Sequence, residues 1–323
     1  MRDHGGDIDK AARRFGRDDW IDLSTGINRR PWPVGTISEH ALTALPTGAS
    51  YVRLQEVAAL AFGCAPEQVA PMAGASAAIQ ILPRLLVPEG RAGRAAVISP
   101  SYNEHAASLR ASGWEVAEAA TIAALHGADL AVVVNPNNPD GRSWQPAEIA
   151  ALAREVGHLI VDESFADPRP ELSIIPSLPE NVTVLRSFGK FWGLAGLRLG
   201  FAVTQTALHR RIAEHAGPWS VSGPALEIGA AALADRDWAR DAVVWLAEAA
   251  VHLDQIMMAQ DCTLVGGTHL FRLYETADAA ALQERLARHA IWSRIFPYNP
   301  RWLRLGLPGS RAEFGRLREV FNA

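Results

Sequence analysis

Lysine is scarce in this sequence of 323 residues, which contains only Lys10 and Lys190. Lys190 lies in the segment 187–193, Ser-Phe-Gly-Lys-Phe-Trp-Gly, directly after a β-branched run typical of a strand. An aromatic turn punctuated by glycine can desolvate a lysine in part, which lowers the pKa of its amine and favours a Schiff base with a carbonyl compound. A single lysine is more often exposed to solvent, so Lys190 indicates this chemistry only together with suitable partners.

An arginine and a carboxylate are candidate partners. Arg198 lies in the segment Gly-Leu-Arg-Leu-Gly. Among apolar neighbours a guanidinium needs an anion, and phosphate suits it well. Asp162 ends a predicted strand, at the edge where open α/β sheets bind their ligands. A carboxylate there can pair with a protonated pyridine nitrogen and keep that ring an electron sink, although it can equally cap a turn.

Two further turns adjoin predicted elements. Segment 135–141, Asn-Pro-Asn-Asn-Pro-Asp-Gly, follows a strand and forms a turn under any interpretation. A functional interpretation places Asn138 on the hydroxyl group of a bound ring. Segment 72–78, Met-Ala-Gly-Ala-Ser-Ala-Ala, opens a helix whose first N–H groups and the Ser76 hydroxyl form an anion site. Many helices begin this way, so that signal is weak by itself.

The elements that must position these residues alternate along the middle of the chain. Strands are predicted at Ala95–Ser99, Leu130–Val134, Leu159–Asp162 and Val182–Leu185, and helices at Ala75–Leu86, Glu104–Ser112 and Pro146–Val156. This alternation predicts an α/β fold with a mostly parallel central sheet flanked by helices.

The two ends of the chain have a different character. We expect residues 1–50 to form an N-terminal arm and part of a small domain, 51–220 a large α/β domain, and 221–323 inter-domain helices and a small α+β C-terminal domain. The C-terminal elements are predicted at Ser222–Ala234, Trp238–Ala259, Cys262–Val265, Leu270–Leu273, Ala279–His289, Arg301–Leu305 and Ser310–Phe321.

The composition argues against several classes of protein. With 49% hydrophobic and 20% charged residues the chain is globular, and its net charge of −4 gives no reason to expect a nucleic-acid partner. No stretch reads as a membrane span or a signal peptide. Cys64 and Cys262 match no metal-ligand spacing. We therefore expect a cytoplasmic protein without a metal, nucleic-acid or membrane partner.

The four motifs, in this order and spacing, resemble the fold-type I enzymes of the aspartate aminotransferase superfamily, which depend on pyridoxal 5′-phosphate (PLP). The resemblance covers nearly the whole chain. It implies that Lys190 carries PLP as a Schiff base and shuttles protons, that Asp162 pairs with the pyridine nitrogen, and that Asn138 contacts the ring hydroxyl.

The same resemblance implies the other cofactor contacts. Phosphate contacts are expected from the backbone of Ala75 and from Ser76, Ser187 and Arg198, ring stacking from Tyr102, and a contact to the phosphate of the partner subunit from Tyr51. The last of these implies a homodimer with shared active sites. Phe165 departs from the pattern, because many relatives have a tyrosine there that bonds the ring hydroxyl, and its absence should shift the pKa of the lysine–cofactor linkage.

The reaction depends on which bond of the substrate Cα is held perpendicular to the ring, so the residues that orient the substrate decide it. His4-Gly5-Gly6-Asp7, the segment 22–28 (Asp-Leu-Ser-Thr-Gly-Ile-Asn) and the segment 217–221 (Gly-Pro-Trp-Ser-Val) resemble the threonine-phosphate decarboxylases of cobalamin biosynthesis. That resemblance implies decarboxylation of O-phospho-L-threonine to (R)-1-amino-2-propanol phosphate.

The decarboxylase resemblance also implies the substrate contacts. His4, Gly5 and Asn28 are expected to help hold the substrate phosphate, and Arg304 to grip the α-carboxylate with a bidentate fork. A further arginine expected four residues after Arg304 is replaced by Pro308, which leaves the details of anion binding and the substrate preference open.

Several alternatives stand beside this interpretation. A PLP-dependent aminotransferase acting on histidinol phosphate or a related amino acid uses the same cofactor residues, so the cofactor motifs do not separate the two reactions. A non-catalytic module that senses PLP or an amino acid is usually fused to a DNA-binding domain, and the chain shows no basic helix-turn-helix. His-Gly-Gly at a chain start also occurs in disordered termini, and Arg304 equally suits an exposed strand face.

Overall fold

The computed structural model describes residues 4–87 and 93–322. By its internal contacts the chain divides into a larger unit, residues 32–138 with 143–236, and a smaller unit, the residues up to Pro31 with 139–142 and 237 onwards. The sequence predicts boundaries after residues 50 and 220, whereas these units divide after 31 and 236. Ala41 packs closely on the larger unit, where a Cβ on Gly223 would lie 2.2 Å from the Ala41 carbonyl oxygen, and this contact bears on the first of the two boundaries.

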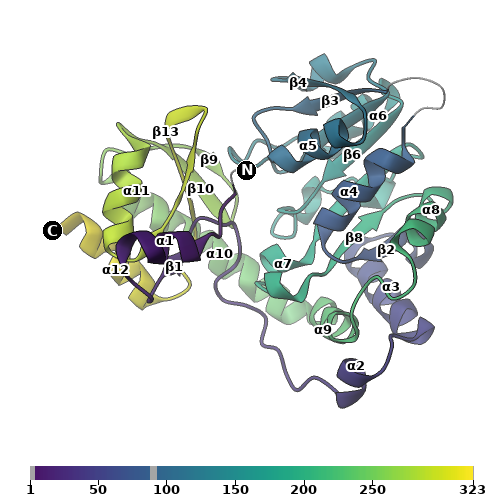
Figure 1. Cartoon of the computed structure of the whole chain (residues 1–323), viewed down its shortest axis with the longest axis horizontal. Helices are drawn as coiled ribbons and strands as arrows, with labels where there is room; N and C mark the ends of the chain where they lie inside the picture. The colour runs from purple at the N-terminus through teal and green to yellow at the C-terminus, as the bar shows by residue number, and fades with distance from the viewer. Residues whose placement is uncertain (1–3, 88–92, 323) are drawn as a thin grey trace. The chain divides into compact units, whose positions relative to one another are not determined.

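Among the described residues, seven strands form the central sheet of the larger unit in the order β2-β8-β7-β6-β5-β3-β4 (Figure 1). The strands are β2 (Val69–Met72), β3 (Arg94–Ile98), β4 (Glu115–Ala119), β5 (Leu130–Val134), β6 (His158–Asp162), β7 (Val182–Ser187) and β8 (Gly200–Val203). The pairs from β4 to β7 are parallel, and β8 is antiparallel to both of its neighbours. The predicted mostly parallel sheet is confirmed, and the carboxyl ends of β5, β6 and β7 meet at one edge.

Helices flank this sheet, as predicted. They are α2 (Glu39–Thr43), α3 (Gly48–Phe62), α4 (Ala75–Leu85), α5 (Asn103–Ala111), α6 (Pro146–Arg154), α7 (Phe188–Phe191), α8 (Thr206–Ala216) and α9 (Gly223–Ala234), with 3₁₀ turns at Pro66–Gln68, Ile122–Leu125, Pro170–Leu172, Ile175–Ser177 and Ala195–Leu197. Ile160 of β6 packs in one buried cluster with Leu82 of α4 and Leu109 of α5. The opposite face carries Phe201, whose ring meets that of Phe62 in α3 at 5.4 Å.

Side chains alternate between the two faces along a strand. Asp162, two residues after Ile160, therefore projects toward α4 and α5, while Glu163 projects to the other side. Among the helices that the structure describes, none combines the length and the apolar character that a membrane crossing requires.

The smaller unit contains a four-stranded antiparallel sheet, in the order β12-β13-β10-β9, and a parallel pair of β1 and β11, counted over the described residues. Its elements are α1 (Ile8–Phe15), β1 (Ile21–Asp22), α10 (Arg236–Met258), β9 (Thr263–Gly267), β10 (Phe271–Glu275), α11 (Ala279–Arg288), β11 (Ile291–Trp292), β12 (Arg294–Phe296), β13 (Asn299–Gly306) and α12 (Arg311–Asn322). The backbone N–H groups of Ile21 and Leu23 donate to the carbonyls of Ala290 and Trp292 at 2.8 Å. Residues 21–23 are therefore part of this unit, through a strand pair.

A half-buried histidine, His158, makes the stability of the fold depend on pH. Nε2 of His158, at the start of β6, lies 2.9 Å from the hydroxyl of Thr183, and burial lowers the pKa of His158 from 6.5 to about 4. Because the pKa is lowered on folding, the unfolded chain takes up the proton first. The contribution of His158 to stability is complete above pH 6.5 and is lost as the pH falls toward 4.

We expect the free energy of unfolding to fall by roughly 3 kcal/mol over this range on account of His158. Urea denaturation of the wild type and of His158→Gln between pH 7 and pH 4.5 checks this. The stability difference between the two proteins should shrink as the pH falls, whereas a constant difference would contradict the assignment.

Candidate active site

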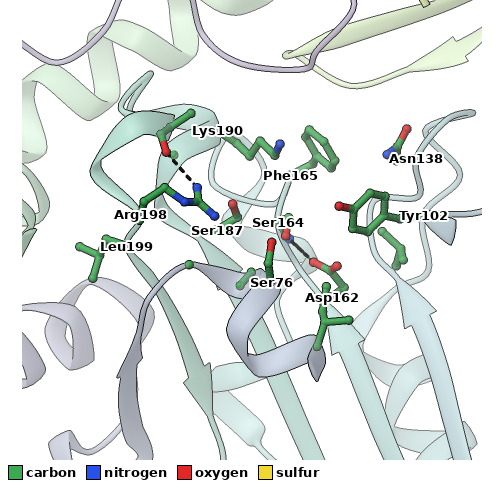
Figure 2. A pocket seen from close by; sticks show the side chains of 16 residues that line it. Ser76, Tyr102, Asn138, Asp162, Ser164, Phe165, Ser187, Lys190, Arg198 and Leu199 are labelled. Atoms are coloured by element: carbon green, nitrogen blue, oxygen red, sulfur yellow. Dashed lines mark hydrogen bonds between the residues drawn. The ribbon is translucent and has the colours of Figure 1, made fainter. Parts of the chain in front are cut away.

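A pocket with about 660 Å³ of empty space lies at the carboxyl edge of the sheet in the larger unit (Figure 2). Eight of the nine predicted cofactor residues line it: Ala75, Ser76, Tyr102, Asn138, Asp162, Ser187, Lys190 and Arg198. The other lining residues are Gly74, Ile79, Val134, Ser164, Phe165, Gly189, Ala195 and Leu199. The fold thus gathers residues from distant parts of the chain around one space.

Asp162, the last residue of β6, is a buried carboxylate with three donors. Its Oδ2 lies 2.8 Å from Nε2 of His105 in α5, and its Oδ1 accepts the backbone N–H of Ser164 at 3.0 Å and the Ser164 hydroxyl at 2.5 Å. Since a carboxylate can only accept, Nε2 of His105 carries the proton. Burial alone raises the pKa of Asp162, but the bonds from His105 and Ser164 outweigh it and the pKa is lowered. Asp162 is therefore held as an anion facing the pocket.

The first turn of α4 forms one wall of the pocket. Its N-cap, Gly74, has φ of 83° and makes no side-chain capping bond. Gly200 of β8 allows this turn to approach the sheet, because a Cβ there would lie 2.3 Å from the backbone nitrogen of Ala75. Ser187 pairs with Gly200 in the sheet, so its hydroxyl and that of Ser76 lie beside the helix start (Figure 2). Hydroxyls at a helix N-terminus suit an anion.

Arg198 adds a positive charge beside this turn. It adopts a left-handed backbone conformation with φ of 56°, which is uncommon for a residue with a side chain. Its Nη1 donates to the carbonyl of Ala195 at 2.9 Å, and a Cβ on Gly74 would lie 2.9 Å from its Nη2. The guanidinium therefore packs against the N-cap of α4, which completes a site suited to a phosphate dianion.

Lys190 lies in α7, a single turn directly after β7. Its Nζ is 5.8 Å from the centroid of the Phe165 ring. Phe188 and Trp192, two residues before and after Lys190 in the sequence, are both buried, and their stacked rings have centroids 5.6 Å apart. A Cβ on Gly189 would lie 2.6 Å from Cα of Ala195, so this tight turn requires glycine. The amine therefore lies near the aromatic ring of Phe165, on the wall of the pocket.

In the turn after β5, Asn137 makes structural hydrogen bonds and Asn138 lines the pocket. Nδ2 of Asn137 donates to the carbonyl of Pro100 at 3.0 Å, and its Oδ1 accepts the hydroxyl of Ser101 at 2.8 Å. Asn137 therefore joins this turn to the one before α5. Asn138 and Tyr102, the next residues along the two turns, line the pocket (Figure 2).

Beneath the pocket lies an ion-pair network that sequence reasoning missed. Nη1 of Arg186 lies 3.0 Å from Oε2 of Glu163, and its Nη2 lies 2.9 Å from Oδ1 of Asp167. Glu163 and Arg186 directly adjoin the pocket residues Asp162 and Ser187, so this network fixes the ends of β6 and β7. The sequence did contain a signal for this network, because Arg186 lies within an apolar strand and a buried arginine there requires an acidic partner.

Tyr51 does not line the pocket that contains Lys190. It lies in another groove of the larger unit with Trp219, and its hydroxyl accepts the N–H of Val221 at 2.9 Å.

The predicted substrate residues lie in the smaller unit. Nη2 of Arg304, on β13, donates to the carbonyl of Ser24 at 2.8 Å, and its guanidinium stands 5.0 Å from the centroid of Phe271. The hydroxyl of Ser24 accepts the N–H of Gly6 at 2.7 Å, and a Cβ on Gly5 would lie 2.4 Å from the Ser24 carbonyl oxygen. The glycines that follow His4 are therefore docked on the residue that Arg304 also contacts.

Asn28 is buried, and its Oδ1 accepts the N–H of Arg30 at 2.9 Å, so it also shapes a turn. Sequence reasoning missed Arg294, which lies directly opposite Arg304 across β12 and β13. Burial and the charge of Arg294 lower the pKa of Arg304 to about 10. Like charges opposite one another are unfavourable, so this face is suited to an anion.

Comparison with known proteins identifies relatives over most of the sequence. Residues 37–321 match the family described as Aminotransferase class I and II. The chain is 42% identical to the threonine-phosphate decarboxylase of Pseudomonas aeruginosa over 327 residues, which cover 98% of this chain and 96% of that protein. It is also 42% identical to a threonine-phosphate decarboxylase of a Sinorhizobium species over 328 residues, with the same coverage.

Among solved structures, the fold is similar to that of histidinol-phosphate aminotransferase from Sinorhizobium meliloti in complex with pyridoxal 5′-phosphate. The TM-score is 0.80 at 21% identity, covering 97% of this chain and 94% of that one. At this identity the likeness concerns the fold. The family match spans most of the sequence, and the chain belongs to the class I and II aminotransferase family.

Proposed function

We propose that this protein is a PLP-dependent decarboxylase that converts O-phospho-L-threonine into (R)-1-amino-2-propanol phosphate and carbon dioxide, a step of cobalamin biosynthesis. The observation that carries the proposal is the pocket that places the Lys190 amine, the Asp162 carboxylate and an anion site around one space. Two relatives named threonine-phosphate decarboxylase, each 42% identical over nearly the full length, support the choice of reaction.

The donor set of the pocket fits PLP group by group. Asp162, held as a buried anion, suits a protonated ring nitrogen. The start of α4 with Ser76, Ser187 and Arg198 suits the phosphate. The Lys190 amine suits the aldehyde. Each charged part of the cofactor has a complementary group.

The uncharged parts of PLP have partners as well. The amide of Asn138 is able to donate to the ring hydroxyl, and the Tyr102 ring offers a stacking surface. Phe165 supplies an aromatic wall and no hydroxyl donor, so the ring hydroxyl depends on Asn138 within this set.

Bound PLP supplies an electron sink for the bond that breaks at the substrate Cα. Asp162 keeps the ring nitrogen protonated, which keeps that sink strong. Lys190, once the substrate amine has replaced it, delivers a proton to Cα after the carboxylate has left as carbon dioxide.

The substrate carries two anionic groups, a carboxylate and a phosphate. Arg294 and Arg304 present two guanidinium groups from paired strands, and a bound anion relieves their repulsion. We infer that Arg304 takes the α-carboxylate, with His4, Gly5 and Asn28 contributing to the phosphate side. A phosphorylated amino acid matches this charge pattern better than an amino acid with an apolar side chain.

We further propose that the protein acts as a cytoplasmic homodimer with shared sites. The position of Tyr51, away from the pocket of its own chain, supports a role for its hydroxyl in a partner subunit. The free thiols Cys64 and Cys262 suit a reducing compartment.

Lys190→Ala should abolish turnover and the visible absorbance of the lysine-bound cofactor, because no other group of the pocket supplies an amine to the aldehyde. Lys10→Ala is the matched control, since Lys10 lies on α1 and is the other lysine of the sequence. Carbon dioxide and aminopropanol phosphate are measured with O-phosphothreonine. Parallel runs with histidinol phosphate and 2-oxoglutarate test for an aminotransferase, and turnover there alone would replace the proposed reaction.

Arg304→Lys should raise the KM for O-phosphothreonine about 10- to 100-fold, since an ammonium cannot reproduce a bidentate fork and a hydrogen bond to a charged group contributes ~1.5–3 kcal/mol. Arg301→Lys is the control, because Arg301 lies on the same strand with 60% of its side chain exposed. Steady-state kinetics and cofactor absorbance are recorded for both variants. An unchanged KM in Arg304→Lys would rule out its role in gripping the substrate.

A further inference from the structure

The carboxylate of Asp162 retains little capacity to accept further hydrogen bonds. A carboxylate has about four acceptor positions, two on each oxygen. Oδ1 accepts both the N–H and the hydroxyl of Ser164, at 3.0 and 2.5 Å. Oδ2 accepts Nε2–H of His105 at 2.8 Å. Within the described part of the chain these bonds fill Oδ1 and leave one position, on Oδ2.

The side chain of Ser164 lies on the same side as that of Asp162, because successive side chains alternate between the two sides of the chain after β6. Asp162 and Ser164 lie on the pocket side, while Glu163 between them is held on the opposite side by Arg186 at 3.0 Å. The Glu163 carboxylate also accepts the hydroxyl of Ser173 at 2.6 Å. The contacts of Glu163 therefore hold the backbone at 162–164 on the side away from the pocket. The two bonds from Ser164 to Oδ1 hold the carboxylate on the pocket side (Figure 2).

We propose that Ser164 is a positioning residue, whose hydroxyl occupies Oδ1 of Asp162 so that Oδ2 alone receives the ring nitrogen of bound PLP. The inference rests on the proposed function. Rotation of the carboxylate about its Cβ–Cγ bond breaks the bonds from both Ser164 and His105, so the direction of the remaining acceptor position is fixed before the cofactor binds.

The hydroxyl also has an electrostatic effect. A hydrogen bond from this hydroxyl to Oδ1 favours the ionised form of Asp162, the form that pairs with a protonated ring nitrogen. Ser164 therefore controls both the direction and the strength of the bond to the ring nitrogen. His105 on helix α5 donates to the other oxygen, Oδ2. The two carboxylate oxygens are therefore held by residues of two structural elements, the end of β6 and helix α5.

Removal of the hydroxyl should change the ring environment and leave substrate binding intact. In Ser164→Ala, Oδ1 keeps the backbone donor and regains an open acceptor position, so the carboxylate no longer presents one defined site. We expect kcat for O-phosphothreonine to fall about tenfold, which corresponds to the lower range for a hydrogen bond to a charged group. The KM should stay within about twofold, because Ser164 acts through Asp162 and not through the substrate.

The decisive measurement is the ¹⁵N resonance of PLP labelled at its ring nitrogen and bound to the full-length protein. The resonance should move in Ser164→Ala and keep its wild-type position in Ser164→Thr, which retains the hydroxyl. Ser108→Ala is the matched control, because it removes another buried hydroxyl, which donates to the carbonyl of Ile79 at 2.8 Å. Thermal unfolding of each variant verifies the fold.

An unchanged resonance in Ser164→Ala, an equal shift in Ser108→Ala, or the same shift in Ser164→Thr would overturn the role of the hydroxyl. The measurement needs no substrate, so it is independent of the reaction. Failure of the wild type to bind PLP through Lys190 would instead defeat the proposed function.

Discussion

The structure depends on keeping one carboxylate charged inside the protein. An unpaired buried charge costs several kcal/mol, so Asp162 is tolerable only where donors surround it. One donor is His105 on α5 and two belong to Ser164, just past β6. The histidine reaches the carboxylate because α5 packs on the face of the sheet to which Asp162 projects. Helix α5 therefore contributes both to the pocket, through His105, and to the hydrophobic layer between the helices and the sheet.

The alternation of side chains along β6 separates the carboxylate that lines the pocket from one that belongs to the ion-pair network. Glu163 faces the other side of β6, where it pairs with Arg186 and fixes the loop that carries Phe165. Two adjacent acidic residues therefore have different tasks, because successive side chains of a strand point in opposite directions. The backbone that aims Asp162 is stiffened by the ion pair of its neighbour, which couples the pocket to the core on both faces of the sheet.

The sequence predicts the buried strands well, since β5 is found at the predicted bounds and β7 extends the prediction by two residues. The antiparallel strand β8 and its neighbour β2 escaped prediction. Both have four residues without alternation, and β2 contains Pro71, which argues against a strand. The pocket residues were predicted through the order of their motifs. His105, Ser164 and Arg294 were not, because their partners are set by packing and strand register, which no local pattern reveals.

Two arginines show how far burial alone identifies a functional residue. Arg186 and Arg304 are both 6% exposed. Burial lowers the pKa of Arg186, but Asp167 and Glu163 outweigh it and the pKa is raised, so its charge is fully compensated by the fold. Burial and the opposing charge of Arg294 lower the pKa of Arg304. An anionic ligand would stabilise the charged form of such a group, and groups with a perturbed pKa gather at functional sites. The contrast indicates a structural role for Arg186 and supports the proposed role of Arg304 in substrate binding.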